Sequence, residues 1–491
     1  MTLSDVRKLL EAKVVTSRAA MRAPIAGISV HSREIRSGWI FIAIAGTHQN
    51  GLAYVEDAIR RGAVAIIAEE AVQVPRGVAL LQVSDCREAA AKLACAFFGD
   101  PSHAMRVIGI TGTNGKTTSA TLLKAVMEQS GMPTGMIGTI AYEIGDRSIA
   151  ATRTTPDCVT LQHLLQDMVK ANCQAAVLEV SSHALVQKRT MCVDFDAVGF
   201  SNLTQDHLDY HPTMEAYYEA KSLLFRQLPA GRVGVVNVDD TWGARLANEA
   251  LACDILRVGM TEDADVVATV FETSLEGSRF TISSPWGEHE VVLPLPGAHN
   301  IHNALLAFGL GCSVGVQPEV AAAGLGRVQH VRGRLQRIPS TAPFAVFVDY
   351  AHTDDALRCV LQSLRHYTKN KLRVVFGCGG GRDKEKRAMM GRAVHAHSDV
   401  AYVTTDNPRN ESPAAIITDV LTAFPPDAAV RDEVDRREAI RLAFSEAQPG
   451  DTVCIAGKGH ESYQEVEGRM LPFDDVTVAM ELLREKGFSA G

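Results

Sequence analysis

The stretch "MRVIGITGTNGKTTSATLLKAVMEQSG", residues 105–131, decides the fold of the central part of this chain. Val107, Ile108 and Ile110 predict a buried strand. The apolar residues between 122 and 127 then recur at the spacing of one helix face, and Gly131 ends the helix. The segment therefore predicts a strand, a glycine-containing turn and a helix in direct succession.

The turn has the composition of a phosphate-binding loop. Gly112, Thr113, Asn114 and Gly115 allow backbone N–H groups to converge on an anion at the helix N-terminus. The next two residues are Lys116, a cation for the outer phosphates, and Thr117, a hydroxyl for Mg²⁺. A strict P-loop has its first glycine where this chain has Ile110, so the match is imperfect. An ordinary strand-to-helix turn is the alternative, but Gly-Lys-Thr-Thr directly after an apolar strand favours phosphate binding.

Composition limits the class of protein. The chain has 491 residues, 46% of them apolar, and a net charge of −8. At roughly 150 residues each, this length predicts about three domains. An acidic balance without a basic tract argues against nucleic-acid or membrane-surface binding. Ten scattered cysteines without a C-x-x-C pair, no signal-peptide pattern in residues 1–15 and no long apolar run predict a cytoplasmic protein with free thiols.

Three α/β regions are expected along the chain. Residues 1–105 contain short strand patterns in "GWIFIAIAG", "GAVAIIAEE" and "VALLQVS", with a helix pattern in "CREAAAKLACAFF". Residues 106–333 alternate strands and helices, except for a period-two segment with turns at Gly277 and Gly287 that predicts an antiparallel meander. Residues 334–491 contain four apolar strands, each followed by a helical pattern. Such a doubly wound parallel sheet binds ligands at the carboxyl ends of its strands.

Two further motifs of the central region carry candidate metal ligands. The strand in "AAVLEVSSHAL" ends in Glu179, a carboxylate that could reach Mg²⁺. In "SNLTQDHLDYH", Asp206, His207, Asp209 and His211 follow the strand "AVGFSN". Two histidines four apart suggest a metal-binding helix face, although Pro212 argues against that helix. Capping and hydrogen bonding are as good an explanation for each residue of the group, and His207 is the favoured ligand.

Lys221 lies on an apolar helix stripe. In "TMEAYYEAKSLLFRQL", Tyr217, Lys221 and Phe225 repeat every four residues. From this pattern alone, a snorkelling side chain with its ammonium in water is the favoured interpretation. The alternative is a desolvated amine of lowered pKa that reacts with CO₂. The resulting carbamate would be a carboxylate-like ligand for a second Mg²⁺.

The order and spacing of eight motifs resemble the ATP-dependent Mur ligase family of peptidoglycan synthesis, over essentially the whole chain. The motifs are "TGTNGKTT", "EVSSHAL", "SNLTQDHLDYH", "GAHNIHNALLA", "VDYAHTDDAL", "GCGGGRDKEKR", "TTDNPRNESP" and "GKGHE". The resemblance implies a UDP-binding N-terminal domain, a central P-loop ATPase domain and a C-terminal Rossmann-like domain that binds an amino acid. It also implies an enzyme that activates a carboxylate as an acyl phosphate and joins it to an amine. A monomer is expected.

The resemblance assigns roles residue by residue. Lys116, Glu179, His207 and Lys221 are implied catalytic residues, with Mg²⁺ held by Thr117, Glu179, His207 and the carbamate of Lys221. Implied ATP contacts are Thr111, the loop from Gly112 to Thr117, Asn300, Asn303, Arg334 and Asp349. Implied contacts with a UDP-muramoyl peptide are Ser32, His48, Thr154, Thr155, Ser181, Gln187 and Arg189.

Members of the family that add diaminopimelate carry a "DNPR" motif, found here as Asp406, Asn407, Pro408 and Arg409. Diaminopimelate differs from lysine by a second carboxylate, which an arginine can bind with two hydrogen bonds. Arg382, Gly457 and Glu461 resemble the remaining contacts of this substrate, Glu461 as the partner of its ammonium group. Without the other motifs, a solvated loop arginine would be the better interpretation of Arg409.

Two positions depart from the family pattern, and several functions stay open. His31 stands where the family has an aspartate near the uridine site, and Arg153 replaces an asparagine before the Thr-Thr pair. A nicotinamide oxidoreductase is weakly suggested by "GCGGGR", in which Arg382 replaces the third glycine of the nucleotide motif. The sequence is also compatible with a non-enzymatic ATP-binding module, with a lysine-adding ligase of the same family and, more distantly, with folate polyglutamate ligation.

Overall fold

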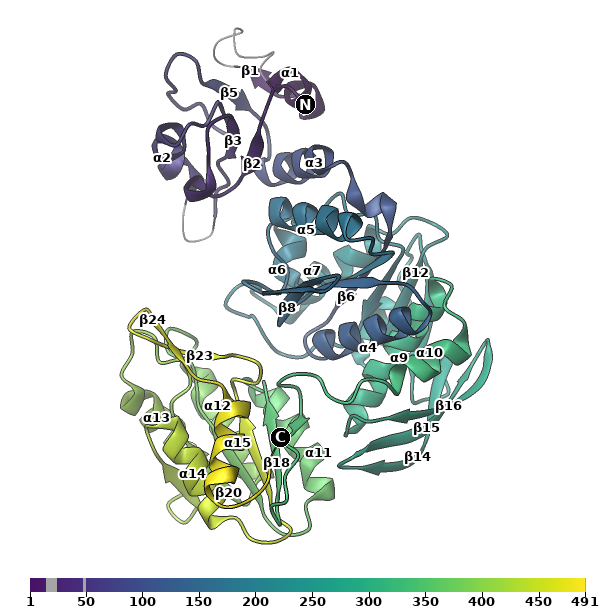
Figure 1. Ribbon diagram of the computed structural model, residues 1–491, viewed down its shortest axis with the longest axis vertical. Coiled ribbons are helices and arrows are strands. Elements are labelled where there is room, and N and C mark those ends of the chain that lie inside the picture. The colour runs from purple at the N-terminus through teal and green to yellow at the C-terminus, as the bar shows by residue number, and fades with distance from the viewer. Residues whose placement is uncertain (15–23, 47–49, 491) are drawn as a thin grey trace.

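The computed structural model describes residues 1–14, 24–46 and 50–490 and has three α/β parts in a row (Figure 1). Each part contains its own sheet, and the chain passes through the three parts in sequence order. The predicted three-domain α/β architecture is therefore confirmed. The exact domain boundaries, after residues 105 and 333, stay a prediction.

The N-terminal part is a five-stranded sheet of order β1-β5-β4-β3-β2, in which only β1 is antiparallel. The three strands expected from sequence are β3, β4 and β5. Their apolar residues are buried because helices cover the sheet. The strands are Lys13–Val14 (β1), Gly27–Ser29 (β2), Trp39–Ile42 (β3), Ala65–Ala68 (β4) and Ala79–Gln82 (β5), and the helices Leu3–Leu9 (α1), Val55–Arg60 (α2) and Cys86–Phe98 (α3).

The central part is an eleven-stranded sheet of order β16-β15-β14-β13-β12-β11-β6-β10-β7-β8-β9. The strands from β7 to β14 in this order are parallel, and β14, β15 and β16 form the predicted antiparallel meander with turns at Gly277 and Gly287. The hairpin β8–β9 was not expected from sequence. The strands are Arg106–Thr111 (β6), Thr134–Ile137 (β7), Ala141–Ile144 (β8), Arg147–Ala150 (β9), Ala175–Glu179 (β10), Ala197–Phe200 (β11), Val233–Asn237 (β12), Asp254–Gly259 (β13), Val266–Ser274 (β14), Gly277–Ser284 (β15) and Gly287–Leu293 (β16).

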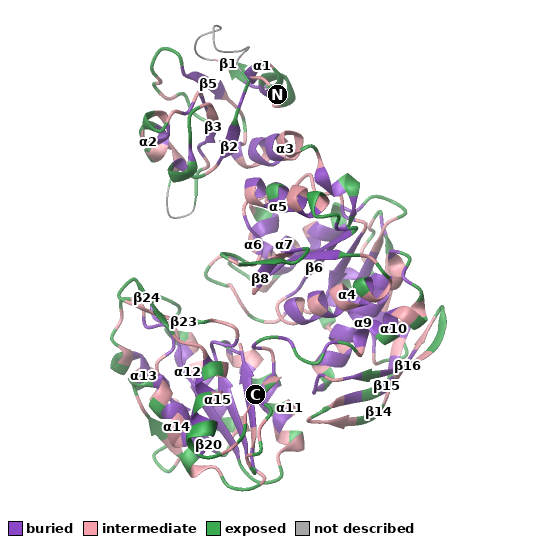
Figure 2. Cartoon of the chain, in the orientation of Figure 1, coloured by how far each residue is buried: buried purple, intermediate pink, exposed green. Residues whose placement is uncertain are grey.

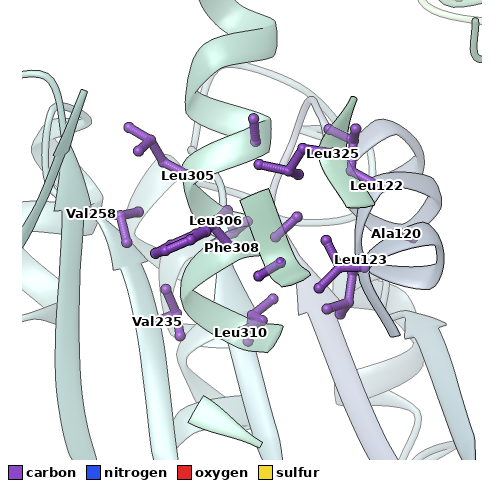
Figure 3. Close-up of a cluster of buried hydrophobic side chains, with 14 of the residues drawn as sticks. Ala120, Leu122, Leu123, Val235, Val258, Leu305, Leu306, Phe308, Leu310 and Leu325 are labelled. Atoms are coloured by element: carbon purple, nitrogen blue, oxygen red, sulfur yellow. The ribbon is translucent and has the colours of Figure 1, made fainter. Parts of the chain in front are cut away.

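The helix after the opening motif packs in the largest core of the central part (Figure 3). Leu122 and Leu123 of this helix, α4, are buried with Leu306 and Phe308 of α9. Figure 2 shows the same buried layer along both helices. The core fixes α4 against the sheet, so the loop before it has a defined position. The helices are Lys116–Gln129 (α4), Cys158–Lys170 (α5), Ser182–Val186 (α6), Met214–Arg226 (α7), Thr241–Leu246 (α8), Ala298–Ser313 (α9) and Pro318–Leu325 (α10).

The C-terminal part is a six-stranded sheet of order β17-β18-β22-β19-β20-β21, parallel except for β17. Three of the four expected strands are followed by helices, but the fourth, β22, is followed by the hairpin β23–β24 before α15. The strands are Gln336–Arg337 (β17), Ala345–Asp349 (β18), Leu372–Phe376 (β19), Val400–Val403 (β20), Val430–Asp432 (β21), Thr452–Ala456 (β22), Tyr463–Val466 (β23) and Arg469–Pro472 (β24). The helices are Asp354–Tyr367 (α11), Glu385–His397 (α12), Pro413–Leu421 (α13), Arg436–Glu446 (α14) and Asp475–Glu485 (α15).

The composition predicts free thiols and no membrane-spanning segment. All ten cysteines are free thiols. Among the described residues, no helix is both long enough and apolar enough to cross a membrane.

Candidate functional site

The loop between β6 and α4 has a conformation that requires glycine at two positions. Gly112 and Gly115 have φ angles of 148° and 84°, in the region that side chains avoid. A Cβ at Gly112 would lie 1.9 Å from Ser201 Oγ, and one at Gly115 would lie 2.2 Å from Asn303 Oδ1. The backbone carbonyl of Asn202 accepts a hydrogen bond from the N–H of Thr113 at 2.9 Å. The side-chain Oδ1 of Asn202 accepts one from the N–H of Asn114, also at 2.9 Å. The predicted phosphate loop is therefore a fixed turn at the start of a helix.

Two lysines meet at one carbonyl of this loop. Lys116 Nζ donates to Gly112 O at 2.9 Å and to Thr113 O at 2.8 Å, and Lys221 Nζ donates to Gly112 O at 2.7 Å. Lys221 is 1% exposed, so the prediction of an ammonium in water is wrong. Burial, followed by the charge of Lys116, lowers the pKa of Lys221 well below its usual value. The Lys116 side chain and the N-terminus of α4 together favour an anion at this loop.

Glu179 connects the loop to a neighbouring strand. Its carboxylate is fully buried at the end of β10 and accepts hydrogen bonds from the hydroxyls of Thr117, at 2.9 Å, and Thr139, at 2.8 Å. The N–H of Thr139 adds a third bond at 2.9 Å. A hydroxyl and a carboxylate are hard oxygen donors that suit Mg²⁺, and this cation usually takes only one or two protein ligands beside phosphate and water. Thr139, which lies outside the motifs identified from sequence, directs this carboxylate.

The histidines of "SNLTQDHLDYH" do not form a helix face. Residues 201–213 are loop and turn, and His207 has a φ of 54°, so the helical interpretation is wrong. His207 lines the cavity beside the phosphate loop, together with Asp206, but Asp209 and His211 do not. His211 is buried and bonds Ser182 Oγ at 2.9 Å. Desolvation lowers the pKa of His207 to about 4, so at neutral pH it has a free lone pair for a metal.

Metal binding in this region would rely on few protein groups. Within residues 1–14, 24–46 and 50–490, no three His, Cys, Asp or Glu side chains gather as a metal site. The structure brings Thr117 and Glu179 into direct contact and places His207 on the wall of the same cavity. The amine of Lys221 donates to Gly112 O in the adjoining loop.

Most residues implied for the muramoyl peptide form one hydrogen-bonded row next to Glu179. Thr154 bonds Thr139 between hydroxyls at 3.1 Å, and Thr155 donates to Glu179 O at 2.7 Å. The row continues through Ser181, whose N–H donates to the Thr155 hydroxyl at 3.0 Å. It ends at Arg189, which donates to Thr155 O and to Gln187 Oε1, both at 2.7 Å. The phosphate loop is thus linked to this row through shared side chains.

The remaining residues implied for this substrate lie in the N-terminal part. Ser32 is buried there, beside the loop after β2, and His48 lies outside the described residues. His31 lies at the boundary with the central part, with Nε2 at 3.7 Å from Asp157 Oδ2, the N-cap residue of α5. The bond to Asp157 raises the pKa of His31. Arg153 carries a positive charge near both His31 and Arg189.

A cavity of about 440 Å³ lies between the central and C-terminal parts, beside the phosphate loop. Asn300 and Asn303 line it from α9 and bond each other at 3.1 Å. From the other side, Arg334 donates to Thr117 Oγ1 at 3.3 Å, and its guanidinium lies 4.6 Å from the ring centre of Tyr350. Asp349 also lines the cavity and accepts the N–H groups of Leu335 and Ala351, which fixes the chain on either side of β18. The four implied nucleotide contacts are therefore brought together.

The residues implied for the amino acid gather at the carboxyl ends of β19, β20 and β22. Asn407 Nδ2 donates to Glu461 Oε2 at 2.9 Å, and Asp406 Oδ2 lies 2.9 Å from where a Cβ of Gly457 would be. Arg409 Nη1 donates to Gly380 O at 2.6 Å, in the loop that also carries the exposed Arg382. Pro408 is buried between Asn407 and Arg409.

Two charged residues of this cluster were missed. Lys458 is fully buried and donates to Asn407 Oδ1 at 3.1 Å and to Glu461 Oε2 at 3.0 Å. Its position within "GKGHE" was the available signal. Glu465 in β23 forms an ion pair with Arg409, Oε2 to Nε at 3.0 Å, and no local pattern indicates this contact.

The linker between the two parts touches this cluster. Gly333 has a φ of 63°, and a Cβ there would lie 2.2 Å from the backbone N of His460 and 2.3 Å from the backbone C of Gly459. The backbone of the linker and that of the "GKGHE" loop are therefore packed directly against each other.

Comparisons with known proteins agree on one family. Residues 24–98 match the model "Mur ligase family, catalytic domain", residues 110–311 "Mur ligase middle domain" and residues 333–459 "Mur ligase, glutamate ligase domain". A protein of Geobacter metallireducens named UDP-N-acetylmuramoyl-L-alanyl-D-glutamate–2,6-diaminopimelate ligase is 40% identical over 513 residues, covering 99% of this chain and 100% of the relative. A protein of the same name from Gloeobacter violaceus is 42% identical, covering 94% of both chains. A solved structure with this name has 32% identity and a TM-score of 0.68, covering 99% of this chain and 100% of the other.

Proposed function

The chain belongs to the Mur ligase family, and on this premise we propose that it joins meso-2,6-diaminopimelate to UDP-N-acetylmuramoyl-L-alanyl-D-glutamate. It is an ATP-dependent ligase of peptidoglycan precursor synthesis that forms an amide and releases ADP and phosphate. The observation that carries this conclusion is the unbroken contact from the phosphate loop through Thr117, Glu179 and Thr139 to Thr154. This contact supports a phosphate site directly beside a polar row suited to a peptide carboxylate.

The cavity between the central and C-terminal parts is the proposed ATP site. The loop N–H groups and Lys116 bind the phosphates at the start of α4. Arg334 reaches the same loop from the C-terminal part, so nucleotide binding needs both parts together. Thr117, Glu179 and His207 are the proposed ligands of Mg²⁺, which would offset phosphate charge when bound.

The reaction has two steps, because a carboxylate is not an electrophile until one of its oxygens becomes a leaving group. An oxygen of the D-glutamate γ-carboxylate attacks the γ-phosphorus of ATP, and ADP leaves. The amine of diaminopimelate then attacks the acyl carbon, and the tetrahedral intermediate expels phosphate. Lys116 stabilises the charge on the transferred phosphoryl group, and closure between the parts excludes water from the acyl phosphate.

Lys221 is proposed to act as a carbamate. A neutral amine is required for attack on CO₂, and burial beside Lys116 favours the neutral form. The neutral amine nitrogen bonds to the carbon of CO₂ and loses a proton, which leaves a carbamate anion in place of an uncharged amine. The anion would be attracted to the neighbouring ammonium of Lys116.

Arg409 is the proposed binder of the second carboxylate of diaminopimelate, and Glu461 the binder of the adjacent ammonium. Both side chains are anchored by neighbours, Arg409 by Gly380 and Glu461 by Lys458. Lysine lacks this carboxylate and would leave the guanidinium without its partner. A lysine-adding ligase, which would not use this contact of Arg409, is the second candidate within the family.

Phosphate release from ATP tests the proposal. The muramoyl dipeptide is supplied with either meso-diaminopimelate or L-lysine at equal concentration. Strong release with diaminopimelate alone supports both the reaction and the role of Arg409. Release with lysine keeps the family and overturns the specificity, while release with neither overturns the ligase function. A monomeric state and a cytoplasmic location are parts of the same proposal.

A further inference from the structure

We propose that Glu465, in the β23–β24 hairpin, is a positioning residue that sets Arg409 for the second carboxylate of the amino-acid substrate. This inference rests on the proposed function, because it concerns the specificity of the same site. It adds an element that lies outside the "DNPR" and "GKGHE" motifs.

The hairpin lies along the whole "DNPR" stretch. Gln464 Nε2 donates to the carbonyls of Thr405 and Asp406, at 3.3 and 3.1 Å. The N–H of Glu465 donates to Asn407 Oδ1 at 3.0 Å. The loop that recognises the amino acid is therefore tied to β23 at three successive residues.

At Arg409 the hairpin holds both backbone and side chain. The N–H of Arg409 donates to Glu465 O at 2.9 Å, and Arg409 O accepts from Glu467 N at 2.7 Å. These bonds matter because Arg409 has a φ of 54°, a left-handed conformation that is unfavourable for a non-glycine residue. The hairpin thus maintains a strained backbone that aims this one arginine.

The contacts of the guanidinium leave a defined part of it for a ligand. Nε donates to Glu465 Oε2 at 3.0 Å, and Nη1 donates to Gly380 O at 2.6 Å. Across the described part of the chain, Nη2 donates to no protein group. A guanidinium has five N–H donors in one plane, so fixing Nε and Nη1 orients the Nη2 edge for a carboxylate. Without Glu465, Arg409 would have to lose side-chain entropy when the substrate binds.

Substitutions of Glu465 separate positioning from direct contact. Glu465→Ala removes the acceptor, and KM for meso-diaminopimelate should rise about tenfold, with kcat within about threefold of the wild type. Glu465→Gln keeps an oxygen that can accept from Nε, so its KM should rise only about threefold. Glu438→Gln removes the same charge from an exposed position on α14, in the same part of the chain, and should leave KM unchanged.

Several outcomes would overturn the inference. An unchanged KM in Glu465→Ala would show that Arg409 needs no positioning. Equal rises in Glu465→Gln and Glu465→Ala would mean that the charge acts on the substrate directly. A parallel rise in KM for ATP would indicate general distortion of the fold.

One comparison distinguishes failure of this inference from failure of the proposed function. If the wild type uses diaminopimelate and Arg409→Ala loses that preference while Glu465→Ala retains it, only the role of Glu465 is wrong. If the wild type shows no phosphate release with diaminopimelate, the proposed function itself fails.

Discussion

The hydroxyl of Thr117 donates a 2.9 Å hydrogen bond to the buried carboxylate of Glu179, which joins the phosphate loop to the end of strand β10. Glu179→Gln keeps the size of this side chain but removes its charge. We expect kcat to fall at least about 100-fold and half-saturating Mg²⁺ to rise at least about tenfold. A magnesium titration of phosphate release measures both. Glu143→Gln, at an ion pair with Lys124, is the matched control, and an unchanged Mg²⁺ requirement would exclude Glu179 as a ligand.

Lys221 is expected to be essential through its carbamate. Lys221→Ala should lower turnover at least about 1000-fold, because the phosphate site would lack an anionic metal ligand. The space left by the side chain should admit a short carboxylic acid or bicarbonate, which would restore part of the activity. Lys124→Ala is the control. Intact-mass measurement should show one added CO₂ on the wild type, and normal activity of the unrescued variant would contradict the carbamate.

The contact between His31 and Asp157 predicts a pH dependence of stability. The pKa of His31 is raised above 6.5 by Asp157, so its stabilising contribution is fully present below pH 6.5 and disappears as the pH rises through the higher folded value. His31→Gln should lower the free energy of unfolding by less than about 1 kcal/mol, since the pair is partly exposed. Urea denaturation at acidic and alkaline pH measures the difference. A larger effect at alkaline pH than at acidic pH would refute this assignment.

Lys386 of α12 bonds Asp206 at 2.9 Å and so links the C-terminal part to the loop that carries His207. This pair should favour the closed arrangement. His207 and Lys386 hold the pKa of Asp206 below its usual range, against the opposing effect of burial. With an ATP analogue and the muramoyl dipeptide, small-angle scattering should show compaction of the wild type and less compaction of Lys386→Ala. Lys384→Ala, at an exposed neighbour, should behave as the wild type. Absence of compaction in the wild type would contradict closure.

Local patterns accounted for much of the fold. The strand and helix around residues 105–131 were predictable because their apolar periodicity and glycine turn lie within one short segment. The meander was predictable for the same reason, with Gly277 and Gly287 at its turns. The hairpin β23–β24 was missed, although Glu467-Gly468 between two extended segments was an available turn signal.

The sequence predicted the arrangement of the site less well than it predicted the fold. Candidate residues came from motifs, but the burial of Lys221 depends on the packing of α7 against β6, which helix periodicity alone did not reveal. The failure of the His207 and His211 helix has a local cause, because His207 adopts a left-handed turn before Pro212. Thr139 and Glu465 act through contacts 40 and 56 residues away along the chain. The individual roles of the site residues stay predictions.

Gly333 of the interdomain linker packs against Gly459, in the loop that carries Glu461. A side chain at residue 333 would meet the backbone of Gly459 and His460, so only glycine fits where the linker passes this loop. One residue beyond Gly333, Arg334 reaches Thr117 in the phosphate loop. A movement of the backbone at Gly333 is therefore expected to shift two contacts together, the one with the "GKGHE" loop and the one between Arg334 and Thr117.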